Sequence, residues 1–147
     1  MKIDFGSVIK AGGAAAVVAI VLGIISQIPF LEVILFVCFC IGGFLIPIGA
    51  GMLYGYFAPG EEDIGESALG GLLAGGTAGI LYGIFQGITA LVFSIFDGGG
   101  VVDILAASAI TTIGSVCGFG ISGLVFGAIG GLLWQLVQQR RGASAGV

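Results

Sequence analysis

The sequence carries little charge. Four basic and eight acidic residues make up 8% of its 147 positions and give a net charge of −4. A soluble domain is about 25% charged, and the mean hydropathy of +1.23 is far above what a water-exposed surface carries. The soluble and disordered classes are therefore excluded. So few basic residues also argue against a nucleic-acid partner, because such a partner requires a basic face.

Histidine is absent, which removes the commonest general base and the commonest metal ligand. Cys38, Cys40 and Cys117 have no histidine or carboxylate neighbours in the sequence, so a zinc or haem site would have too few ligands. We interpret the three cysteines as small buried apolar residues. The sequence thus predicts no metal site, no cofactor and no enzyme activity.

Proline is scarce and glycine abundant, with three and 30 residues respectively. The glycines lack the three-residue period of collagen, which would also need many more prolines. In a chain that is 58% hydrophobic, frequent glycine is instead typical of transmembrane helices. The remaining class is an integral membrane protein.

Charged residues divide the chain into four long uncharged stretches, at 11–31, 33–60, 67–96 and 104–139. A bilayer core of roughly 30 Å requires about 20 apolar residues in a helix, so each stretch suffices for one crossing. The stretches lack the alternation of a membrane β-strand. We predict an all-α polytopic membrane bundle that forms one domain over residues 1–147. Its four transmembrane helices are expected at about 9–28, 33–57, 68–96 and 106–137.

The last predicted helix is the longest, and Gly118-Phe119-Gly120 is the place where it could break. We expect one continuous helix, with the break as the alternative. Its length exceeds the bilayer core, so part of it must lie outside the hydrocarbon.

Basic residues predict the orientation. Short cytoplasmic segments retain lysine and arginine, and an even number of crossings places both termini on the same side. We therefore expect both termini in the cytoplasm of a cell that is most simply prokaryotic. Tyr54, Tyr56 and Trp134 are expected at the cytoplasmic interface, where aromatic residues collect. The basic residues are Lys2, Lys10, Arg140 and Arg141.

Glycines at four-residue spacing are the strongest pattern. In lipid, helices associate through close backbone packing, which glycine permits. The rows are interpreted as faces that pack the four helices together; docking of another copy or subunit and a groove for a flat lipid, quinone or pigment are the alternatives. Two rows on the last helix suggest two close neighbours, one of which could lie outside the chain. The candidate packing residues are Gly71, Gly75, Gly79, Gly83 and Gly87, then Gly114 and Gly118, then Gly123, Gly127 and Gly131.

Uncharged polar residues supply a second candidate site. The predicted spans contain no ionisable residue at mid-membrane, where ion and proton paths usually place one. Gln86, Thr89, Thr111 and Ser115 could line a polar pathway. Hydrogen bonds between helices, or back to a residue's own helix, are the alternative roles of such side chains. We favour a clamp between helices.

The middle of the chain resembles a known kind of protein. Its layout, from Gln27-Ile28-Pro29-Phe30 through Ile41-Gly42-Gly43 and Gly51-Met52-Leu53-Tyr54-Gly55 to the row of Gly71–Gly87, is similar to small glycine-rich four-helix membrane proteins of prokaryotes that lack an assigned function. The long, hydroxyl-rich last helix departs from that layout. The resemblance implies a four-helix fold and no catalytic or binding residue.

Packing residues are plentiful and reactive ones are missing, so we expect a non-enzymatic membrane scaffold or accessory subunit. Its partners would be the lipid bilayer and either further copies of itself or other membrane subunits. The alternative function is a small oligomeric channel or transporter for a small solute, which would use the polar pathway.

Overall fold

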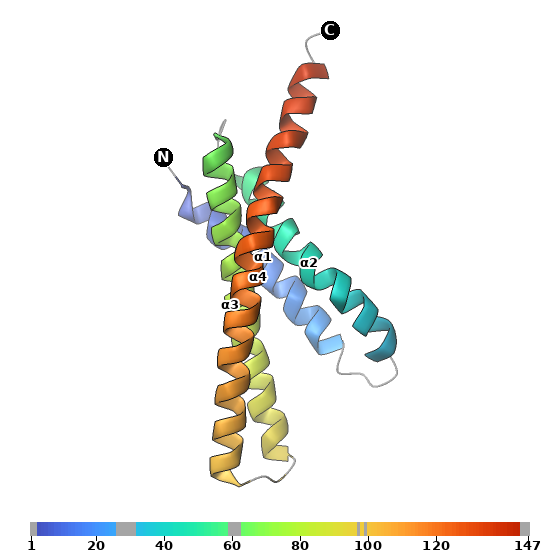
Figure 1. Cartoon of the computed structure of the whole chain (residues 1–147), viewed down its shortest axis with the longest axis vertical. Helices are drawn as coiled ribbons and strands as arrows, with labels where there is room; N and C mark the ends of the chain where they lie inside the picture. Colours follow the sequence, from blue (N-terminus) through green and yellow to red (C-terminus); the bar gives the residue numbers. More distant parts are fainter. Residues whose placement is uncertain (1–2, 26–31, 59–62, 97, 99, 145–147) are drawn as a thin grey trace.

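A computed structural model describes the backbone of residues 3–25, 32–58, 63–96, 98 and 100–144, and the side chains of these residues outside 32–43 and 141–144. Within these ranges the regular structure is entirely helical (Figure 1). The helices are α1 (Phe5–Ile25), α2 (Glu32–Phe57), α3 (Ile64–Phe96) and α4 (Val101–Ser144).

The described helices agree with the predicted all-α architecture, and their bounds differ from the predicted ones by a few residues. Helix α1 begins earlier than expected because Asp4 caps it: the Asp4 carboxylate accepts the backbone N–H groups of Gly6 and Ser7 at 3.1 and 3.2 Å. Helix α4 runs unbroken through Gly118-Phe119-Gly120. The predicted turn around residues 26–29 lies outside the described residues.

Three helices are long and apolar enough to cross a membrane, namely α1, α3 and the part of α4 from Val101 to Arg140. In α2, the portion whose side chains are described, Phe44–Phe57, is a shorter apolar helix. The three long apolar helices indicate a membrane protein.

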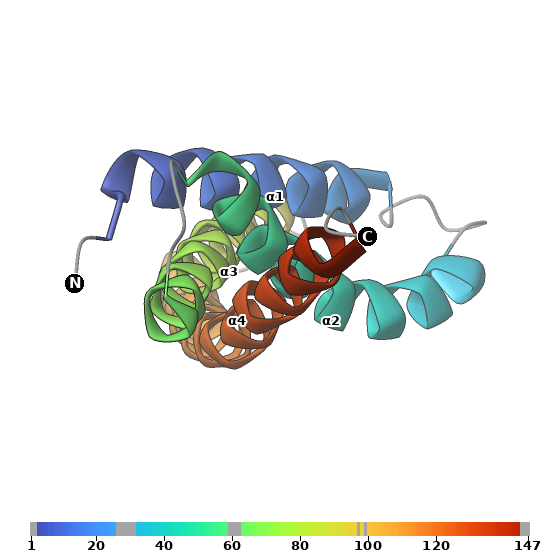
Figure 2. The same ribbon diagram turned by 90° about the horizontal axis from the view of Figure 1, so that it is seen from above.

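Helices α3 and α4 form an antiparallel hairpin, and α1 and α2 lie against one side of it (Figure 1). Seen along the hairpin, α1 lies across it and does not run beside it (Figure 2). One end of the hairpin, where α3 ends and α4 begins, extends beyond α1 and α2 (Figure 1). At the other end, the Ser7 hydroxyl of α1 contacts the Phe57 carbonyl of α2 at 3.0 Å.

Small residues fill the centre of the molecule. Ala15, Ala50 and Ala78 form one buried cluster contributed by three helices. Large apolar side chains such as Ile9 and Phe44 are exposed instead. This distribution suits lipid as the surrounding solvent, because large apolar side chains gain nothing by leaving it.

The prediction that Tyr54 belongs to the aromatic belt is wrong. Its exposed fraction is 0%, and its ring lies over Gly70 of α3, where a Cβ would overlap it. Glycine at position 70 leaves room for the ring between α2 and α3. Tyr56, two residues later, is exposed and packs edge-to-face against Trp134, with ring centroids 5.9 Å apart.

Candidate functional site

The glycine row of α3, which comprises Gly71, Gly75, Gly79, Gly83 and Gly87, faces α4 along its whole length. A Cβ at Gly75 would overlap the carbonyl oxygen of Gly123, and one at Gly83 would lie 2.7 Å from the Cα of Val116. Such separations leave no space for any side chain. The backbones of α3 and α4 are therefore in direct contact, which also favours weak Cα–H···O interactions.

The second glycine row of α4 completes this contact. Gly123, Gly127 and Gly131 are buried, and a Cβ at any of them would overlap a carbonyl oxygen of α3. For Gly127 the overlapping atom belongs to Gly71, and for Gly131 it belongs to Ser67. Glycine thus stands on both sides of the hairpin interface.

Helix α2 contacts the same stretch of α4 from another direction. A Cβ at Gly51 would overlap the carbonyl oxygen of Gly127, and one at Gly130 would overlap that of Ile48. Phe44 of α2 and Phe126 of α4 also pack edge-to-face, with ring centroids 4.9 Å apart. This half of α4 is thereby in contact with two helices of its own chain, while side chains such as Val125 and Ile129 remain exposed.

Gly114 and Gly118, the first glycine row of α4, are placed differently. A Cβ at either position would meet nothing within 4 Å, and both residues are exposed. The surrounding surface is apolar apart from the exposed Thr111 beside it. We call it the α4 outer face; it consists of Ile110, Ile113, Gly114, Cys117, Gly118 and Ile121, all exposed.

Cys117 lies on the α4 outer face and is an exposed free thiol. The expectation that it is buried is therefore wrong. The reason is its position one residue before Gly118 on a surface that the described residues leave uncovered. The side chains of the other two cysteines lie outside the described residues.

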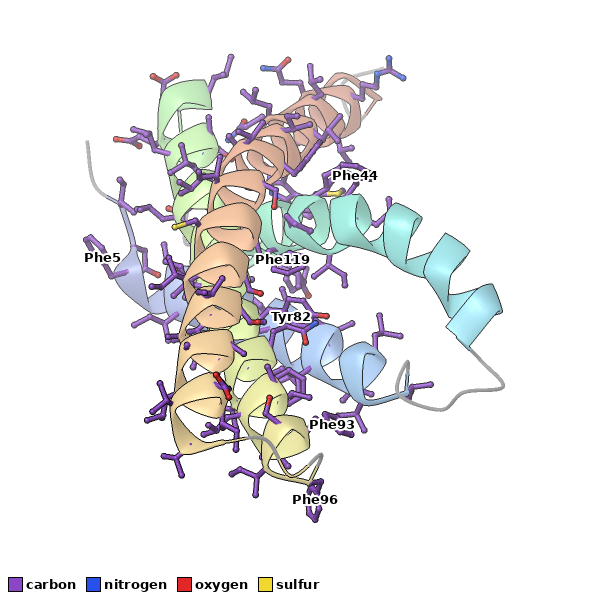
Figure 3. The ribbon with its side chains drawn as sticks, turned by 60° about the horizontal axis from the view of Figure 1, so that its bottom comes forward. Phe5, Phe44, Tyr82, Phe93, Phe96 and Phe119 are labelled. Carbon is purple, nitrogen blue, oxygen red and sulfur yellow. The ribbon has the colours of Figure 1, made fainter. Side chains whose placement is uncertain are left out.

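Gln86 and Thr89, the two residues of α3 in the predicted polar pathway, donate hydrogen bonds within their own helix. The Gln86 side-chain N–H donates to the Tyr82 hydroxyl at 2.6 Å, and the Thr89 hydroxyl donates to the Phe85 carbonyl at 2.9 Å. We expected these side chains to bond between two helices. These two hydrogen bonds instead join successive turns of α3. Tyr82 does reach α4, because its ring packs edge-to-face on Phe119 at 4.8 Å (Figure 3).

Thr111 and Ser115, the two residues of α4 in the predicted polar pathway, make no hydrogen bond to Gln86 or Thr89 among the described side chains. Thr111 is exposed and Ser115 is partly exposed. The backbone around Ser115 lies beside Gly83, since a Cβ there would be 2.9 Å from the Ser115 carbonyl carbon. The hairpin therefore brings Gln86 and Ser115 to a similar level without linking them.

Two hydrogen bonds between helices were missed by the sequence reasoning. The Ser67 hydroxyl of α3 donates to the Gly131 carbonyl of α4 at 3.0 Å in a buried setting. The Ser7 hydroxyl of α1 lies 3.0 Å from the Phe57 carbonyl and 2.5 Å from the Asp4 carboxylate. A signal for Ser67 was present, because it stands four residues before Gly71 and so continues the glycine row.

The hydrogen bonds at the start of α1 lower the pKa of Asp4. The hydrogen bond from the Ser7 side chain is the main reason why the pKa of Asp4 lies below its ordinary value of 3.8, and backbone N–H groups of Gly6 and Ser7 act in the same direction. Asp4 is therefore held as a carboxylate. An anion there also suits the positive end of the helix dipole.

Among the described side chains, no three histidine, cysteine, aspartate or glutamate residues come close enough to hold a metal ion. Comparison of the chain with protein-family models, curated proteins and solved structures finds no match. Any functional assignment must therefore come from the geometry of the helix faces.

Proposed function

We propose that this chain is a non-enzymatic scaffold or accessory subunit of a cell membrane, most simply a prokaryotic cytoplasmic membrane. It crosses the bilayer four times with both termini in the cytoplasm. Its glycine-lined helix faces hold the bundle together, and the α4 outer face packs against a second copy or another membrane subunit.

The arrangement of helix ends supports four crossings. The start of α1 touches the end of α2 through Ser7 and Phe57, and the start of α3 touches the late part of α4 through Ser67 and Gly131. The two helices of each of these pairs thus run in opposite directions. The basic residues of both tails then fall on one side, as the distribution of lysine and arginine requires.

The open surroundings of Gly114 and Gly118 carry the docking part of the proposal. Glycine costs about 1 kcal/mol relative to alanine in a helix, and the other glycines of the α3 and α4 rows are in contact with a neighbouring helix. At Gly114 and Gly118 the described part of the chain supplies no such neighbour. A helix from outside would fit between the flanking isoleucines, because small residues at four-residue spacing allow close approach in lipid.

Cys117 allows a direct test. With Cys38 and Cys40 replaced by alanine, Cys117 is the remaining thiol, and it can be labelled with a maleimide-benzophenone and irradiated in native membranes. The proposal predicts a discrete adduct, either a dimer or a complex with one other subunit. The adduct should fall at least tenfold when Gly114 and Gly118 are both changed to leucine.

The matched control is a thiol elsewhere on the lipid-facing surface. Val17 of α1 is also exposed, so Val17→Cys in a chain without other cysteines reports random encounters. If Cys117 gives no more adduct than Val17→Cys, or if the double leucine variant retains the adduct, the docking role is wrong.

A further inference from the structure

The exposed apolar surfaces of the helices differ in length. On α1 they extend from Phe5 to Ile25, which is about 30 Å at 1.5 Å per residue. On α3, Ile64 is exposed in the first turn beside the acidic residue Glu66, and beyond that turn the exposed apolar surface extends from Leu69 to Phe96, or about 40 Å. The hydrocarbon core of a bilayer is roughly 30 Å thick. Helix α1 therefore matches the bilayer, and α3 exceeds it by about a quarter of its apolar length.

The excess lies at the end of the hairpin that extends beyond α1 and α2. Phe96 is 82% exposed and Val101 is 74% exposed, and Phe96 points away from the rest of the molecule (Figure 3). Large apolar side chains exposed to this degree are costly in water, at about 25 cal/mol per Å² of apolar surface. The side chains of Phe96 and Val101 therefore favour contact with lipid, whereas the exposed Asp103 in the same turn of α4 favours the headgroup level.

The packing of the helices offers a way to provide that contact. Helix α1 crosses the hairpin obliquely (Figures 1 and 2), so α1 and α3 cannot both stand along the membrane normal. The contacts of Gly12 with Ala74 and of Gly23 with Tyr82 fix this crossing at two levels. If α1 is upright, α3 is necessarily inclined, and its longer apolar surface then fits within the same thickness.

We infer that the α3–α4 hairpin lies steeply tilted in the bilayer while α1 stands near the normal, so that lipid acyl chains reach Phe96 and the exposed Asp103 carboxylate stays at the headgroup level. An apolar length of about 40 Å fits a core of about 30 Å at a tilt of roughly 40°, which is the upper edge of the range for transmembrane helices. The inference rests on the four crossings proposed above and is independent of the docking role of α4.

Solid-state NMR of the whole chain in aligned bilayers with a core of about 30 Å measures the two tilts in one sample. Selective ¹⁵N-isoleucine labelling places probes on α1 at Ile9, Ile20 and Ile24 and on α3 at Ile80, Ile84 and Ile88. Single isoleucine-to-valine substitutions assign the signals. The pattern of ¹⁵N shift against dipolar coupling gives the tilt of each helix separately, and α1 serves as the internal control for α3.

We expect a tilt below about 20° for α1 and of roughly 40° for α3. Equal tilts for both helices, or a near-upright α3, would overturn the inference, since the hairpin would then protrude or thicken the bilayer. An α1 that lies in the membrane plane would overturn it together with the four crossings. Loss of the Cys117 adduct has no bearing on these tilts, so failure of the docking role is recognised separately.

Discussion

Ser67 and Gly131 contact each other in both directions. The Ser67 hydroxyl donates to the Gly131 carbonyl at 3.0 Å, and a Cβ at Gly131 would overlap the Ser67 carbonyl oxygen. At this level of the hairpin, α3 and α4 are therefore joined both by a hydrogen bond and by direct contact between their backbones. Ser67 has an exposed fraction of 0%, so neither water nor lipid can replace its partner.

Replacing Ser67 by alanine should lower the free energy of unfolding by about 1 kcal/mol, because hydrogen bonds between membrane helices contribute roughly 0.6–1.7 kcal/mol. Ser94→Ala is the matched control, since the Ser94 hydroxyl bonds only to the Ala90 carbonyl of its own helix among the contacts described. Unfolding in mild detergent measures both. Equal losses for the two variants would show that the contact between helices adds nothing.

Gly75→Ala should destabilise the fold, whereas Gly118→Ala should not. The added methyl group at Gly75 would overlap the Gly123 carbonyl, whereas at Gly118 it would meet nothing within 4 Å. We expect Gly75→Ala to cost about 1–3 kcal/mol through overpacking, and Gly118→Ala to be neutral or stabilising by up to about 1 kcal/mol through helix propensity. Thermal unfolding of the purified variants decides this. A neutral Gly75→Ala would contradict direct backbone contact across the hairpin.

The helices themselves were largely predictable, because the lengths of the uncharged stretches and the bilayer thickness determine them. Which face of each helix contacts which other helix was harder to predict. The step from Gly118 to Gly123 is five residues, which turns the glycine row by about 140° around α4 at 3.6 residues per turn. The sequence therefore indicated two faces on α4, but it did not say which face meets α3, since that choice depends on contacts with residues distant in sequence.

The polar residues show a different limit. Gln86 stands four residues after Tyr82, so a partner on its own helix was available from the start. The sequence reasoning favoured a partner on another helix because buried amides often bridge helices in lipid. The four-residue spacing of Tyr82 and Gln86 was the better predictor of this hydrogen bond.

The burial of Tyr54 was missed for a related reason. It depends on the absence of a side chain at Gly70, which no pattern around Tyr54 reveals.

A scaffold should not conduct solutes. Liposomes that contain the purified chain should show no flux of ions or small polar solutes above empty vesicles, and Gln86→Leu should change nothing in this assay. The physical reason is that Gln86 and Thr89 direct the described hydrogen bonds to α3 itself. Selective flux that disappears in Gln86→Leu would favour the channel or transporter alternative over the scaffold.

Acid should weaken the start of α1. The pKa of Asp4 is lowered in the folded chain, chiefly by the Ser7 hydroxyl, so the cap stabilises the fold above the ordinary pKa of 3.8 and is lost as the pH falls through the lower folded value. Asp4→Asn retains a capping side chain but cannot titrate. The difference in melting temperature between wild type and Asp4→Asn, measured from pH 7 down to pH 3, should therefore be constant above about pH 5 and shift against the wild type below about pH 4. A difference that stays constant over the whole range would show that the Asp4 charge has no part in holding α1.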